Sequence, residues 1–83
     1  MTTLLGQRLR QARKRSGMTQ KHLATESKLS VQEISYLENG HHKNPKLRTL
    51  VALADALYQS IDALAGRVPL KDPRYAERES GNS

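Results

Sequence analysis

Apolar residues recur along most of the chain at the spacing of an α-helix that packs one face against a core. Leu5, Leu9 and Ala12 fall on one face of the first such segment, while its basic residues lie mostly elsewhere. No segment alternates apolar and polar residues over the length of a strand, so we expect no sheet. The pattern predicts helices over about 5–15, 20–27, 31–38 and 47–58, with a short fifth helix from residue 60 to about 66.

Polar residues at the ends of these segments support the predicted boundaries. Thr19 can cap the second helix, and Ser30 can cap the third, with Glu33 at the spacing of a capping box. Gly40 can adopt the left-handed conformation that ends a helix, and Pro45 suits the start of the next one. The third segment is therefore a short helix with a defined beginning and end, and its outer face is polar but lightly charged.

Between residues 47 and 64, apolar residues repeat in a strict three-four pattern that has two interpretations. One is a coiled coil, and the other is a core-facing stripe that a dimer partner could share. The repeat is short and is interrupted at Gln59 and Ser60, which favours the core. The repeat consists of Leu47, Leu50, Ala54, Leu57, Ile61 and Leu64. The residues assigned to the core alone are Leu9, Leu23, Ala24, Ile34, Leu37, Leu50, Ala54, Leu57 and Leu64.

Charge is unevenly distributed along this chain of 83 residues, which is long enough for one small domain. Lys and Arg number 14 against 8 Asp and Glu, which gives a net charge of +6. Every residue before Glu26 that carries a full charge is basic. Such a bias raises the local concentration of a polyanion, although a solvated helix would show the same pattern.

Several function classes lack their sequence signals. There is no Cys for a disulfide or a Cys-based zinc site, and the adjacent His41 and His42 lack the spacing of a helical metal site. No nucleophile motif surrounds the Ser, His and Asp residues. We therefore expect no catalytic residue, no metal, no cofactor and no small-molecule ligand. No segment resembles a membrane span or a signal peptide, so we expect a cytoplasmic protein without a membrane partner.

The last segment, residues 67–83, differs in character from the rest. Its sequence, "RVPLKDPRYAERESGNS", is rich in charge and contains two of the three prolines. Few apolar residues are available to anchor it, so we predict a polar tail that is disordered or loosely docked. Such a tail could bind a protein partner.

The order of these pieces resembles one known family. "LRQAR" (9–13), "GMTQKHLA" (17–24), "SVQEISYLENG" (30–40), Pro45, "LRTLVALADAL" (47–57) and "SIDAL" (60–64) together resemble the lambda-repressor and Cro family of DNA-binding domains, also called the XRE family. The resemblance covers about residues 5–66. It implies an all-α fold, a compact five-helix domain in which the third helix is the recognition helix of a helix-turn-helix.

The resemblance also implies which residues contact bases. It places Ser30, Val31, Gln32 and Tyr36 at base-reading positions, with Glu33 beside them. The Gln32 amide can pair with N6 and N7 of adenine, whereas Val31 can only make apolar contact, as with a thymine methyl. Tyr36 could contact the DNA backbone instead of a base. Glu33 could cap the helix, and this role would compete with base contact. Without the family resemblance, each would be an ordinary exposed helix residue.

The resemblance also implies that a second group of residues contacts the DNA backbone. This group consists of Thr19, Gln20, Asn39, Lys43 and Lys46, although Lys43 could equally be a solvated lysine. Arg13 and Glu38 are implied to pair between the first and third helices, which would orient Arg13 toward phosphate. One position departs from the family, because Lys28 stands where the turn often has a left-handed glycine, at a strain of about 1 kcal/mol.

These implications favour a sequence-specific regulator that binds double-stranded DNA. A single domain buries little surface, so we expect a homodimeric repressor that reads two half-sites of a palindromic operator. Two alternatives remain at this point. One is an antitoxin whose tail blocks a toxin, and the other is a restriction-modification controller.

Overall fold

Five α-helices form in the part of the chain that the computed structural model describes, residues 3–42 and 44–71. They are α1 (Leu4–Arg15), α2 (Gln20–Ser27), α3 (Val31–Glu38), α4 (Leu47–Leu57) and α5 (Ile61–Leu64). No strand occurs within these ranges, which confirms the predicted all-α, five-helix fold. None of the described helices is both long and apolar enough to cross a lipid bilayer.

Side-chain caps define the start of four of these helices. The hydroxyl groups of Thr3, Thr19, Ser30 and Ser60 each accept a hydrogen bond from the backbone N–H three residues later. Each cap satisfies a backbone donor that has no partner within its helix. Because the caps are local features, the sequence alone indicates three of these four helix starts. The remaining helix, α4, begins after Lys46 without a side-chain cap.

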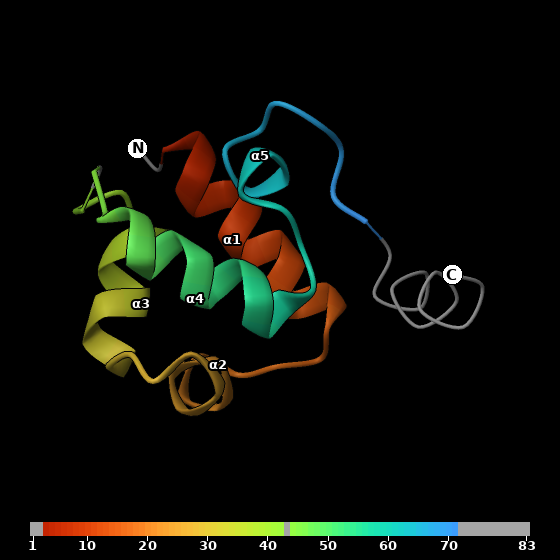
Figure 1. Cartoon of the computed structure of the whole chain (residues 1–83). Coiled ribbons are helices and arrows are strands. Elements are labelled where there is room, and N and C mark those ends of the chain that lie inside the picture. The colour runs from red at the N-terminus through yellow and green to blue at the C-terminus, as the bar shows by residue number, and fades with distance from the viewer. Residues whose placement is uncertain (1–2, 43, 72–83) are drawn as a thin grey trace.

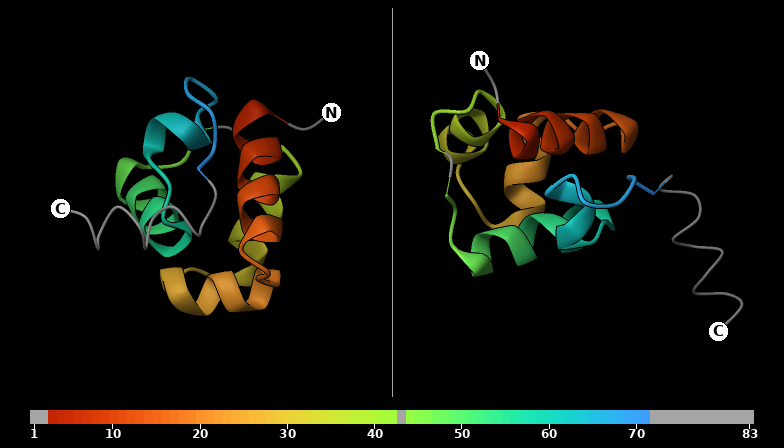
Figure 2. Two further views of the ribbon diagram at one scale, coloured as in Figure 1. Left: turned by 90° about the vertical axis from the view of Figure 1, so that its right-hand side faces the viewer. Right: turned by 90° about the horizontal axis from the view of Figure 1, so that it is seen from above.

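The helices are arranged around a single apolar core. In Figure 2 (left), α1 lies on one side, α4 and α5 lie on the other, and α2 crosses one end between them. The helix α3 packs against α1 and α2, and α5 packs against α1 and α4. Figure 1 shows α3 at the edge of the molecule, which leaves one of its faces without a covering helix. The fully buried large side chains are Leu9, Leu23, Ile34, Leu37, Leu53, Leu57 and Leu64.

The core-facing side of α4 differs from the predicted stripe. Leu50 is only partly buried and lies outside the core cluster, whereas Leu53 is fully buried in it. Leu47, the first residue of the predicted repeat, is 67% exposed. The buried face of α4 contains Thr49, Leu53 and Leu57 at four-residue spacing. The predicted stripe therefore lay to one side of the face that meets the core. The assignment of Leu50 to the core was therefore wrong.

The chain remains packed beyond residue 66, where the domain was predicted to end. The Gln59 side-chain amide donates from Nε2 to the Lys71 carbonyl oxygen at 2.7 Å. In return, the Lys71 backbone N–H donates to Gln59 Oε1 at 2.8 Å. Leu70 packs against the core from the same segment. Residues 67–71 therefore belong to the folded domain, and the rest of the predicted tail lies outside the described residues.

Candidate nucleic-acid interface

The helices α2 and α3 are joined by a tight turn at Lys28. Lys28 adopts the left-handed conformation, with φ 61° and ψ 31°, and its backbone N–H bonds back to the end of α2. Leu29 N–H then donates to the Ala24 carbonyl at 3.0 Å. The turn thus has the left-handed geometry expected there, although the residue is not glycine. Two short helices joined in this way form a helix-turn-helix.

A glycine allows α1 to cross closely over α3. Gly6 is buried, and a Cβ at this position would lie 2.5 Å from the Leu37 carbonyl oxygen and 2.8 Å from that of Glu38. Those distances are too short for any side chain, so the backbones meet directly. This contact fixes the C-terminal end of α3 against the domain.

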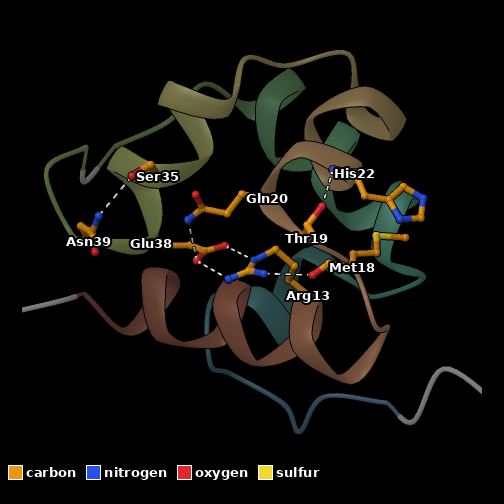
Figure 3. Close-up of polar contacts among 8 residues, drawn as sticks. All are labelled: Arg13, Met18, Thr19, Gln20, His22, Ser35, Glu38 and Asn39. Carbon is orange, nitrogen blue, oxygen red and sulfur yellow. Dashed lines mark hydrogen bonds and ion pairs between the residues drawn. The ribbon is translucent and has the colours of Figure 1, made fainter.

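One buried carboxylate connects three helices (Figure 3). Glu38 on α3 accepts from Arg13 Nε at 2.7 Å and from Arg13 Nη2 at 3.0 Å. Its Oε1 atom also accepts from Gln20 Nε2, at the start of α2, at 3.2 Å. Arg13 Nη1 donates to the Met18 carbonyl at 2.9 Å, in the connection between α1 and α2. The pair implied by the family resemblance is therefore present, and it holds both helices of the helix-turn-helix to α1.

The residues expected to contact bases lie at the start of α3 and along its outer face. Ser30, Val31, Gln32 and Tyr36 are exposed, and Glu33 is half-buried. Val31 and Tyr36 are 43% and 46% exposed, which is high for such large apolar side chains. Ser30 Oγ accepts from Glu33 N–H at 3.0 Å, so the Ser30 hydroxyl caps α3. Gln32 Nε2 donates to Tyr36 Oη at 2.9 Å, one turn further along the same face.

The residues expected to contact phosphates lie at helix ends. Thr19 is exposed at the start of α2, and its Oγ1 atom caps His22 N–H at 3.0 Å (Figure 3). Asn39 is exposed at the end of α3 and donates to Ser35 Oγ at 3.2 Å. Lys46 is exposed at the start of α4, and Gln20 is half-buried beside Glu38. Lys43 lies outside the described residues.

Arg13 differs from the other residues expected at phosphates. It is 9% exposed, and three of its nitrogen atoms donate hydrogen bonds within the protein. Its guanidinium group therefore acts chiefly to hold α1, α3 and the connection after α1 together. Other basic residues are exposed, among them Arg10, Lys14 and Arg15 on α1 and Lys21 on α2.

Sequence reasoning missed three polar contacts of this site. The Gln32–Tyr36 and Ser35–Asn39 pairs are four residues apart on one helix, a spacing at which side chains meet, so this signal was available. The Gln20–Glu38 bond joins two helices and has no such local signal. Among the described residues, no three His, Asp or Glu side chains are grouped as a metal site would require.

Comparison with known proteins supports this architecture. The model of the helix-turn-helix family matches residues 9–64. No curated protein sequence matches the chain. The crystal structure of the restriction-modification controller protein C.AhdI from Aeromonas hydrophila is similar, with 34% sequence identity and a TM-score of 0.70. The match covers 74% of this chain and 91% of that one. The chain therefore belongs to the XRE-type helix-turn-helix family of DNA-binding transcription regulators.

Proposed function

We propose that the protein is a sequence-specific regulator that represses transcription as a homodimer on a palindromic operator. The observation that carries the proposal is the outer face of α3, which no helix covers and which exposes mostly uncharged side chains, among them Gln32 and Tyr36. Side chains that donate and accept hydrogen bonds distinguish base edges, whereas charges alone would bind any phosphate. The protein would act in the cytoplasm of a prokaryotic or phage-infected cell.

In this proposal, α3 lies in the major groove. Gln32 contacts an adenine, and Val31 contacts a thymine methyl nearby. Ser30, Glu33 and Tyr36 border these two residues on α3 and complete the surface that meets the base edges. The bonds of Glu38 to Arg13 and Gln20 keep α3 in a fixed position while it is bound.

Backbone contacts fix the position of the domain on the duplex. Thr19 and Gln20 lie at the start of α2, where the partial positive charge of the helix end favours a phosphate. Asn39 and Lys46 lie on either side of the connection from α3 to α4, and Lys43 belongs to that connection in the sequence. Phosphate contacts of this kind orient the protein but carry no sequence information.

The homodimer follows from the small size of the binding surface. One recognition helix reads few base pairs, so high specificity requires two domains. A two-fold symmetric pair would place its recognition helices in successive major grooves, about 34 Å apart. The operator would then be a palindrome whose half-sites have that separation.

A second candidate function is control of a restriction-modification system. The observation that favours it is the likeness to C.AhdI, which is itself a restriction-modification controller. Both candidates use the same fold and the same DNA-binding face. They differ in the genes that lie beside the operator.

Selection of bound sequences from random duplex DNA tests the proposal. It should be done at about 0.15 M salt, where non-specific binding is weak. The expected result is a two-fold symmetric motif that contains adenine in each half-site. Enrichment of no motif would refute sequence-specific binding by this protein alone. Occurrence of the motif beside restriction and methylation genes in the source genome would identify the protein as their controller.

A further inference from the structure

We propose that Tyr36 positions the Gln32 amide so that it selects adenine over guanine. This inference rests on the proposed function, because it assumes that Gln32 faces a base. It assigns to the Tyr36 hydroxyl a role in specificity that acts through Gln32. The carrying observation is the 2.9 Å hydrogen bond from Gln32 Nε2 to Tyr36 Oη on the exposed face of α3.

The direction of this hydrogen bond determines what Gln32 presents to a base. The amide nitrogen has two N–H groups, and one of them points to Tyr36. The other N–H and the Oε1 atom then form the outward edge of the planar amide. Adenine offers a matching pair in the major groove, because N7 accepts a hydrogen bond and the N6 amino group donates one.

The reverse direction would favour guanine. If the Tyr36 hydroxyl donated to Gln32 Oε1, both N–H groups of the amide would be free to face a base. Guanine N7 and O6 are both acceptors, so guanine would match that arrangement. Without any bond to Tyr36, the amide could rotate between the two states. The hydroxyl thus decides whether one glutamine prefers adenine or tolerates guanine.

A DNA phosphate would reinforce the direction seen in the structure. Phosphate oxygens only accept hydrogen bonds, so a Tyr36 hydroxyl beside the DNA backbone must donate its proton to them. Its oxygen is then left to accept from Gln32 Nε2, as it does in the free protein. Contact with the backbone and selection of adenine are therefore compatible roles for the same side chain.

The segment after α3 holds Tyr36 in place. The backbone N–H groups of His41 and His42 donate to the Tyr36 carbonyl oxygen at 2.8 and 3.3 Å. The His41 ring packs edge-to-face with the Tyr36 ring, with centroids 5.8 Å apart and an interplanar angle of 67°. These contacts limit the movement of Tyr36, and its hydroxyl already meets Gln32 Nε2 in the protein without DNA.

The test uses in-vitro selection with the intact protein and the variants Tyr36→Phe, Gln32→Ala and the two combined. The relevant position is the one where Gln32→Ala abolishes the adenine preference. At that position Tyr36→Phe should lower the ratio of adenine to guanine by about fivefold, as expected for the loss of one hydrogen bond. In the Gln32→Ala background, Tyr36→Phe should leave this ratio unchanged, because Tyr36 acts through Gln32.

Tyr58→Phe is the matched control, because it removes a hydroxyl from another exposed tyrosine, at the end of α4. It should leave the ratio unchanged, and circular dichroism should show that all variants remain folded. If the intact protein selects no motif, the proposed function fails. If it selects one but Tyr36→Phe keeps the full adenine preference, only the present inference fails. An equal effect of Tyr36→Phe with and without Gln32 would also overturn it, because Tyr36 would then read a base itself.

Discussion

Arg13 and Glu38 face each other at the crossing of α1 and α3, with 2.7 Å between Arg13 Nε and Glu38 Oε2. Their side chains are only 11% and 3% exposed, so both charges have lost most of their water. The attraction between them offsets this desolvation only because the geometry is bidentate and further polar groups complete it. Gln20 and the Met18 carbonyl supply those groups. The pair therefore fixes the arrangement of the helices more than it adds stability.

Removal of one member of this pair should strongly destabilise the protein. Arg13→Met keeps an aliphatic stem but leaves the Glu38 carboxylate buried without its cation. We expect the free energy of unfolding to fall by about 3–5 kcal/mol, measured by urea denaturation. The variant Arg13→Met with Glu38→Leu has no buried charge and should recover much of this loss. A double variant no more stable than Arg13→Met would contradict the explanation.

Gly6→Ala should destabilise the protein, although this substitution usually stabilises a helix. In an exposed helix interior, alanine is more stable than glycine by about 1 kcal/mol. At Gly6 the added Cβ would overlap the carbonyl oxygens of Leu37 and Glu38, so α1 and α3 must separate. We expect the free energy of unfolding to fall by about 1–3 kcal/mol, as for other overpacked sites. A gain in thermal stability on this substitution would show that α1 and α3 can move apart freely.

Local signals explain why the helix-turn-helix was predictable from the sequence. Ser30 caps α3 and Gly40 follows it with φ 78°, and both roles depend only on neighbouring residues. The face of α4 that meets the core was less predictable. Apolar residues at 47, 50, 53 and 57 allow two overlapping stripes, and packing against α2 and α5 decides between them. Only tertiary structure therefore identifies Leu53 as a core residue and leaves Leu50 partly exposed outside the core cluster.

The candidate site shows the same division between local and tertiary information. The exposure of Gln32 and Tyr36 agrees with their place on the outer face of a helix, which spacing alone indicates. The burial of Arg13 could not be predicted from spacing, because an arginine among other basic residues looks like a solvated side chain in the sequence. The Glu38 carboxylate that pairs with Arg13, and the Gln20 amide that donates to Glu38, come from helices that meet only in the folded domain.

Lys28→Gly should stabilise the protein. Lys28 has φ 61°, a conformation that is strained for residues with a Cβ and unstrained for glycine. Glycine also gives the unfolded chain more freedom, which reduces the net gain to about 0.5 kcal/mol or less. Thermal unfolding would measure it, with Lys28→Ala as the control that removes the charge but retains the strain. Equal stabilisation by both substitutions would attribute the gain to the lost charge.

Gln59 should control how firmly residues 67–71 are held. Its buried amide makes two hydrogen bonds with the Lys71 backbone, one as donor and one as acceptor. Gln59→Ala should lower the free energy of unfolding by about 1–3 kcal/mol. It should also speed tryptic cleavage after Arg67, which is exposed in this segment. Gln59→Glu keeps only the acceptor and should give an intermediate cleavage rate. Unchanged cleavage in both variants would show that the two Gln59 hydrogen bonds do not hold the segment.

Lys46→Ala should weaken binding to all DNA sequences by the same factor. Lys46 is exposed at the start of α4 and makes no side-chain cap there, so its loss should leave the fold intact. If it contacts a phosphate, the slope of log affinity against log salt should become shallower by about one unit. Gln32→Ala should instead reduce affinity by about 1–3 kcal/mol at one base position and leave the slope unchanged. Arg67→Ala is the control, because Arg67 is also basic and exposed but follows α5, which packs against α1 and α4. If Lys46→Ala altered base preference while Gln32→Ala altered only the salt slope, the proposed orientation of α3 on DNA would be wrong.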